Sequence, residues 1–142
     1  MEIKALGPGD LELLMGVTPG LFDHALSPVE ARAFLDSPLH ELVLALDAGQ
    51  ALAFASGTVL LHPDKPPALF VNELGTRHTH RRRGHGCAVL RALIERARAR
   101  GCQGVWLGTE PGNAAMIALC RSLGAEEMPF VGFGWDRAFS AG

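Results

Sequence analysis

Hydrophobic and polar residues follow two spacings along this chain, and these spacings predict its strands and helices. Alternation, or a short apolar run between turn residues, is typical of strands, whereas apolar residues three and four positions apart are typical of helices. The first pattern predicts strands over residues 2–6, 40–47, 51–62, 69–76, 104–109 and 128–136. The second predicts helices over residues 8–17, 28–36, 84–100 and 113–123. The order β-α-α-β-β-β-α-β-α-β predicts a mixed α/β domain built on one sheet.

Two of the predicted helices carry terminal signals in addition to their spacing. Ser27 precedes Pro28 and stands three residues before Glu30, which is the spacing of a capping box. The segment 84–100 places its apolar residues on one stripe and is followed by Gly101, a residue type that commonly ends helices. We therefore expect both helices to form with these boundaries.

The composition indicates a soluble globular protein with a single domain over residues 1–142. Hydrophobic residues make up 48% of the chain, yet no apolar run reaches the length of a membrane span, so we expect no membrane partner. The first residues lack the basic and apolar regions of a secretion signal. The three cysteines form no CxxC pair and suggest free thiols in a reducing compartment. We expect a cytoplasmic protein.

Charge is strongly segregated along the chain, although the net charge is only −2. Residues 1–76 contain three basic and ten acidic side chains, whereas residues 77–100 contain eight arginines and one glutamate. Three of these arginines directly precede Gly84, where a helix is predicted to begin. The N-terminus of a helix attracts anions, and its first N–H groups have no partners within the helix. The pattern therefore predicts an anion site at this loop.

Other interpretations of this loop fit less well. A dinucleotide-binding fingerprint needs a third glycine where the chain has Val89, and no P-loop motif is present. Nucleic-acid binding would call for aromatic side chains that stack on bases, but none lies between Phe70 and Trp106. We therefore expect no nucleic-acid partner. A solvated basic loop with no ligand is the simplest alternative.

Residue types that bind metals also gather near this loop, at His78, His80, His85 and Cys87. Their spacing matches no common structural zinc pattern. The three adjacent arginines would also repel a divalent cation. We predict no metal site here and expect the histidines to face solvent.

The basic loop and the segments around it resemble the GNAT superfamily of acyl-CoA-dependent N-acetyltransferases. Arg81–Gly86 matches the family loop [Gln/Arg]-x-x-Gly-x-[Gly/Ala], and Leu74–Thr76 takes the place of the Leu-x-Val pattern before it. Asn113 and the helix after it are similar to a later family pattern, but Cys120 stands where the family has Tyr and Ala125 where it has Phe. The stretch 69–86 looks most like small bacterial aminoglycoside 3-N-acetyltransferase-like proteins.

The resemblance implies a fold and a cofactor. The fold would be a mostly antiparallel central sheet flanked by four helices, in one domain. The cofactor would be acetyl-CoA, with its pyrophosphate on the loop and its pantetheine arm along the preceding strand. The residues implied in cofactor binding are Leu74, Gly75, Thr76, Arg81, Arg82, Arg83, Gly84, His85, Gly86, Cys87 and Asn113.

Transfer of an acetyl group to an amine requires groups that move protons. Glu73 is the candidate base, because it matches an acidic residue of the aminoglycoside-type proteins and precedes Leu74; it would also contact the acceptor. Glu110 is the second candidate. The chain has no tyrosine, so Cys120 would have to protonate the leaving thiolate, and the alternative is that it serves only as a small buried hydrophobe. Asp23 is the candidate for binding a cationic acceptor.

The predicted function is acetylation of a primary amine of a small molecule, by direct attack in a ternary complex. An aminoglycoside-like amine is one candidate acceptor. Two alternatives stay open: acetylation of a protein amino group, and a non-catalytic acyl-CoA-binding or regulatory module. The alternating stretch 130–135 is also a candidate edge for pairing with a second copy in a homodimer.

Overall fold

Five strands form one mixed sheet in the computed structural model, which describes residues 1–135. The strands β1 (Glu2–Ala5), β2 (His40–Asp47), β3 (Gln50–Leu60) and β4 (Ala68–Thr76) are antiparallel neighbours in this order. The short strand β5 (Val105–Trp106) pairs with β4 in parallel. The sheet confirms the predicted mixed α/β class with a mostly antiparallel sheet.

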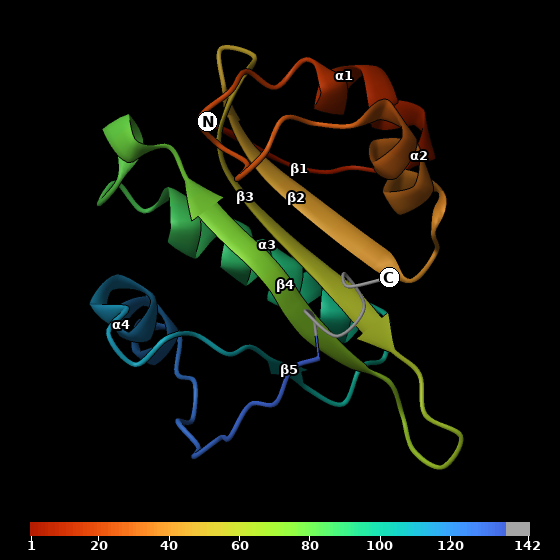
Figure 1. Cartoon of the computed structure of the whole chain (residues 1–142), viewed down its shortest axis with the longest axis vertical. Coiled ribbons are helices and arrows are strands. Elements are labelled where there is room, and N and C mark those ends of the chain that lie inside the picture. Colours follow the sequence, from red (N-terminus) through yellow and green to blue (C-terminus); the bar gives the residue numbers. More distant parts are fainter. Residues whose placement is uncertain (136–142) are drawn as a thin grey trace.

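Helices cover both faces of this sheet (Figure 1). The helical segments of the described chain are η1 (Pro8–Asp10), α1 (Leu11–Met15), α2 (Pro28–Asp36), η2 (His78–His80), α3 (His85–Ala99) and α4 (Ala114–Ser122). Helices α1 and α2 lie against one face and α3 lies against the other. The predicted first helix is therefore a 3-10 turn followed by a short α-helix. At α2, the Ser27 hydroxyl accepts a hydrogen bond from the Glu30 N–H, as its sequence signal predicts.

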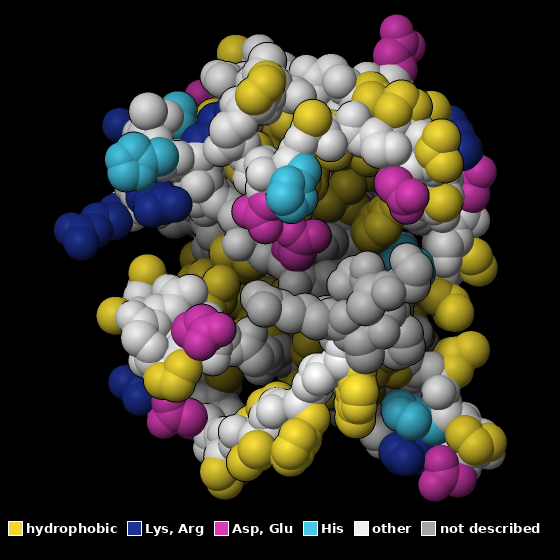
Figure 2. All heavy atoms as spheres, viewed as in Figure 1, with side chains coloured by type: hydrophobic (Ala, Val, Ile, Leu, Met, Phe, Trp, Pro, Cys, Tyr) yellow, Lys and Arg dark blue, Asp and Glu magenta, His cyan; other side chains and the backbone are white. Residues whose placement is uncertain are grey.

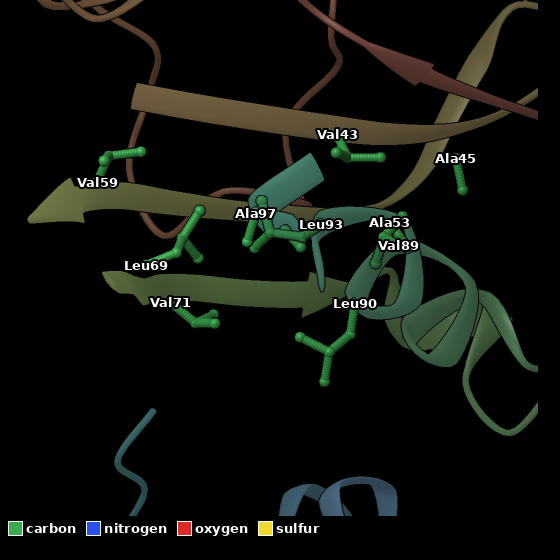
Figure 3. Packing of buried hydrophobic residues seen from close by; sticks show 11 residues of the cluster. Val43, Ala45, Ala53, Val59, Leu69, Val71, Val89, Leu90, Leu93 and Ala97 are labelled. Atoms are coloured by element: carbon green, nitrogen blue, oxygen red, sulfur yellow. The ribbon is translucent and has the colours of Figure 1, made fainter. Parts of the chain in front are cut away.

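Helix α3 packs on the sheet through the apolar stripe that its spacing predicts (Figure 3). Alternate residues of the strands supply the other half of this core, because successive side chains of a strand point to opposite faces. The buried residues of the cluster are Val43, Ala45, Ala53, Ala55, Val59, Leu69, Val71, Val89, Leu90, Leu93 and Ala97. The remaining apolar residues of β2 and β3, such as Leu44 and Phe54, form a second core with α1 and α2.

A buried carboxylate ties β2 to the end of α3. Glu41 is only 2% exposed and receives hydrogen bonds from Arg96 and Arg100, the latter at 2.7 Å. Burial on its own raises the pKa of Glu41, but the hydrogen bonds and charges of the two arginines outweigh it, so the pKa lies below its ordinary value. The ion pairs therefore stabilise the fold while Glu41 is ionised.

Replacing Glu41 by glutamine should lower the free energy of unfolding by about 2 kcal/mol at neutral pH, because charge-assisted hydrogen bonds are lost. A lowered pKa in the folded state contributes stability above the unfolded pKa, and this contribution disappears as the pH falls through the folded value. The difference between wild type and variant should therefore shrink below about pH 4. Urea unfolding of wild type and variant at pH 7 and at pH 3 measures this difference in the free energy of unfolding. An equal difference at both values would contradict this role of Glu41.

The last predicted strand, residues 128–136, is not formed within the described chain. Residues 128–135 have no regular secondary structure, and Asp136 lies outside the described residues. Large apolar side chains stay exposed there, with Phe133 at 82% and Trp135 at 68%. The prediction was wrong because alternation marks a segment suited to a sheet, but a strand also needs a partner edge.

Candidate active site

A bulge in β4 decides which way Glu73 points. Ser56 of β3 pairs with Glu73 and the next residue, Gly57, pairs with Val71, so Asn72 is an extra residue in β4. Leu69 and Val71 face α3, and simple alternation would turn Glu73 to the same side. The extra residue reverses the alternation after Asn72. Glu73 therefore faces the α2 side of the sheet, where it lines a cavity together with Ser56.

Beyond the bulge, β4 has a free edge, because β5 leaves it after two residue pairs. Register pairs join β5 only to Leu69 and Phe70, so β5 is shorter than the predicted 104–109. The Arg77 N–H donates to the Leu52 carbonyl of β3 at 2.8 Å. Hydrogen-bonded pairs alternate along an antiparallel ladder, so the peptide groups of Leu74 and Thr76 point away from β3. They face the side from which β5 has turned away, and no described strand pairs with them there (Figure 1).

The N-terminus of α3 lies beside this free edge. Its N-cap, Gly84, has φ +82° and offers no side-chain cap. The N–H groups of His85, Gly86 and Cys87 have no acceptor among residues 1–135. A Cβ on Gly86 would lie 3.4 Å from the Thr76 hydroxyl oxygen, which shows how closely the helix approaches the edge of β4.

The three arginines of the loop are exposed and form no ion pair with any carboxylate of the described chain. Arg82 also has a positive φ of 65°, a backbone conformation uncommon outside glycine. Unpaired guanidinium groups and unpaired helix N–H groups thus share one small region next to the edge of β4. This region can bind an extended anion such as a diphosphate.

The other predicted cofactor and proton-transfer residues lie around α4. Asn113 is its N-cap: the side-chain oxygen accepts from the Met116 N–H at 3.1 Å and the amide nitrogen donates to the Thr109 hydroxyl at 3.1 Å. Cys120 is half-buried on α4, and burial raises the pKa of its thiol. Glu110 lies in the exposed loop before α4 and is not part of the cavity that Glu73 lines.

On the opposite side of the sheet from α3, a cavity of about 310 Å³ opens between the α1–α2 layer and β4. Its floor is apolar, and its charged lining residues are Asp23, Glu30 and Glu73, joined by His24. Figure 2 shows a hollow on this face with hydrophobic side chains inside and acidic side chains on both sides. Two residues from distant parts of the sequence, Asp23 and Glu73, are thus brought to one site, as their predicted roles require.

A buried arginine holds the loop that carries Asp23. Arg77 is 8% exposed and donates from its side chain to the Ala51 and Pro19 carbonyls at 2.7 and 2.8 Å, and to Thr18. Sequence reasoning missed this role, because Arg77 belongs to an arginine-rich segment in which nothing marks one member as buried. It also missed Ser56 and Glu30 in the cavity. Ser56 could have been noticed because it is a polar residue within the apolar run 51–60.

Within residues 1–135, no three side chains of the metal-binding types come together as a candidate metal site. None of the helices in the described part of the chain has the length and hydropathy needed to span a bilayer.

The model of the acetyltransferase (GNAT) family matches residues 11–125. The curated L-methionine sulfoximine/L-methionine sulfone acetyltransferase of Pseudomonas paraeruginosa (strain DSM 24068 / PA7) is 40% identical over 113 residues, which cover 72% of this chain. The enzyme of the same name from Pseudomonas aeruginosa is 49% identical over 59 residues, or 39% of the chain. The matches span 60% and 34% of the lengths of these two relatives.

Solved structures share the fold. An aminoglycoside acetyltransferase from an uncultured soil metagenomic sample, in complex with trehalose, has a TM-score of 0.81 at 15% identity and covers 94% of each chain. AAC(6')-Iy in complex with the bisubstrate analogue CoA-S-monomethyl-acetylneamine has a TM-score of 0.78 at 21% identity, over 94% of this chain and 95% of the other. Because the family model covers most of the sequence and the fold agrees, the chain belongs to the acetyltransferase (GNAT) family.

Proposed function

We propose that this protein is an acetyl-CoA-dependent N-acetyltransferase that acetylates a primary amine of a small molecule. One observation carries the proposal: β4 has a free edge where β5 leaves it, and in the same stretch the bulge turns Glu73 toward an acidic cavity on one face of the sheet. A cofactor along the edge and an amine in the cavity would then meet at the same residues. The family match to residues 11–125 supports this activity.

The described residues fit acetyl-CoA in two places. The peptide groups of Leu74 and Thr76 are suited to bond the pantetheine arm as an added strand would. The unpaired N–H groups at Gly86 and its neighbours, with Arg81–Arg83, are suited to the diphosphate. Gly84 keeps a Cβ out of the space before the helix, and Asn113 orients the start of α4. We propose these residues, with Gly75, His85 and Cys87, as the cofactor site.

Acetyl-CoA supplies an acetyl group held as a thioester, whose C–S bond breaks as the acceptor nitrogen forms its bond to the acetyl carbon. We propose that Glu73 takes the proton that the amine must lose, directly or through a water. We propose that a backbone N–H near Leu74 stabilises negative charge on the carbonyl oxygen. The raised pKa of Cys120 keeps its thiol protonated at neutral pH, so it can return a proton to the departing sulfur. Glu110 is the second candidate base.

A small amine as the acceptor agrees with the relatives. The curated relatives are named for acting on L-methionine sulfoximine and L-methionine sulfone, and the structural neighbours are aminoglycoside acetyltransferases. Both are small amines, and the cavity is of the size that small ligands occupy. We propose Asp23 as an acceptor-binding residue because it lines the same cavity as Glu73.

We also propose the setting in which the enzyme works. One sheet with a core on each face supports a single domain over residues 1–142. Three free thiols, at Cys87, Cys102 and Cys120, support a location in the cytoplasm. The exposed apolar segment 128–135 supports contact with a second copy of the chain in a homodimer.

Incubation of the purified protein with acetyl-CoA and a panel of small primary amines should release free thiol at about 1 s⁻¹ or faster with at least one amine. Thiol release measured by a colorimetric reagent, with mass spectrometry of the acetylated amine, tests the proposal. Binding of acetyl-CoA without thiol release across the panel would favour a non-catalytic acyl-CoA-binding module. Turnover confined to peptides would favour a protein amino-group acetyltransferase.

A further inference from the structure

The cavity that Glu73 lines carries negative charge at several points around an apolar floor. Asp23 comes from the loop before α2, Glu30 from the first turn of α2, and Glu73 from the bulge of β4. Building on the proposed function, we infer that the acceptor is an amine with a second cationic group and no carboxylate. Glu73 would face the reacting amine, and Asp23 with Glu30 would face the second cation.

A buried hydroxyl within the cavity indicates that a polar ligand group belongs there. Ser56 is 6% exposed, and its hydroxyl forms no hydrogen bond with any other residue of the described chain. Fully enclosed side-chain polar atoms in the described chain all have partners, so this hydroxyl is open to the cavity. Ser56 stands directly opposite Glu73 across the strand pair. A buried hydroxyl and an exposed carboxylate on neighbouring strands can together hold an ammonium or amine group.

The charges of the cavity lining favour a diamine over an α-amino acid. No lysine or arginine of residues 1–135 lines the cavity, and His24 is the only other titratable side chain there besides the three acids. An α-amino acid would bring its own carboxylate among these carboxylates, and like charges at short range repel. A diamine brings a second cation, which the acids attract.

The apolar floor sets the kind of spacer between the two cationic groups. The rings of Phe22 and Phe54 lie tilted against each other with centroids 4.2 Å apart, and Phe34 and Leu42 continue this surface. Burial of methylene groups or of an apolar ring face against such a surface is favourable. An acceptor with two amino groups joined by a hydrocarbon spacer therefore satisfies the floor and both acidic sides.

Four amines test the inference by thiol release with saturating acetyl-CoA: pentane-diamine with its amino groups at the two ends, pentylamine, L-lysine and L-methionine sulfoximine. The first three share a five-carbon chain and differ only in the second ammonium and the carboxylate. The diamine should be turned over with a kcat/KM about tenfold above that for each of the other three. One charge-assisted hydrogen bond to the second cationic group corresponds to about this factor. Equal or better turnover of L-lysine, L-methionine sulfoximine or pentylamine would overturn the inference while leaving the N-acetyltransferase proposal intact. Absence of thiol release with all four would overturn the inference, and absence across the whole panel of small amines would overturn both.

A matched pair of variants tests whether the preference for the diamine arises from the cavity. Asp23→Asn should raise KM for the diamine about tenfold with little change in kcat, so that the advantage over pentylamine disappears. Asp47→Asn is the control, because Asp47 is an exposed carboxylate that lies outside the cavity and is not ion-paired within residues 1–135. An unchanged ratio of diamine to monoamine in Asp23→Asn, or an equal loss in both variants, would show that Asp23 does not recognise the second cation.

Discussion

Replacing Gly84 by valine should abolish measurable binding of acetyl-CoA while the protein stays folded. Gly84 has φ +82°, where a residue with a Cβ is strained by about 1–2 kcal/mol. Nothing in the described chain lies within 4 Å of the added Cβ, so the variant meets no steric clash of its own. We expect the new side chain to occupy the open space at the start of α3. Loss of two charge-assisted hydrogen bonds of about 1.5–3 kcal/mol each corresponds to at least about a hundredfold weaker binding.

The measurement is a calorimetric titration with acetyl-CoA, supported by amide chemical shifts of residues 82–87. Gly101→Val is the matched control, because Gly101 follows the same helix at its other end, has φ +78° and also has open space around its Cβ. Both variants should lose similar amounts of thermal stability, but only Gly84→Val should lose the cofactor. Tight binding by Gly84→Val would remove the loop from the cofactor site, and equal loss in both variants would point to general strain.

Replacing Glu73 by glutamine should lower kcat about a hundredfold with unchanged affinity for acetyl-CoA. Glutamine keeps the shape of the side chain but cannot accept a proton from the amine, and general bases typically contribute about 10²–10⁴-fold. The cofactor affinity should persist because the peptide groups of Leu74 and Thr76 point to the free edge of β4, whereas the Glu73 side chain points to one face of the sheet. Steady-state thiol release gives kcat, and calorimetry with acetyl-CoA gives the affinity.

Glu110→Gln is the informative comparison for this prediction. Glu110 is the alternative base, and the structure places it in an exposed loop outside the cavity. If kcat falls in Glu73→Gln alone, Glu73 is the base. If kcat falls in Glu110→Gln alone, the roles are exchanged and the bulge has no part in proton transfer. Equal turnover in wild type and both variants would mean that no carboxylate side chain of this pair takes the proton.

The missing tyrosine gains a physical interpretation from the environment of Cys120. A thiol with a raised pKa is held in its protonated form, which is the form that a proton donor requires. Burial explains the raised pKa in the same way whether or not the thiol acts in catalysis.

Local patterns predicted much of the fold because they depend on residues close in sequence. The caps of α2, the apolar stripe of α3 and the glycine at its start are each determined within a few residues. The same reasoning overestimated the strands. Pairing between β4 and β5 ends at Trp106, and residues 128–135 remain without a strand, because the length of a strand depends on its neighbour and not on its own alternation.

The sequence by itself determined where the helices and the first four strands form, and it located the basic loop ahead of α3, because helix spacing, capping and charge order are local properties. Only the tertiary structure decided the cavity that we propose as the acceptor site. The register of β3 against β4 turns Glu73 away from α3 and sets it opposite Ser56, and Arg77 fixes the loop that brings Asp23 to the same cavity. These placements rest on contacts between residues distant in the chain, and one extra residue in a strand reverses the direction of every side chain that follows.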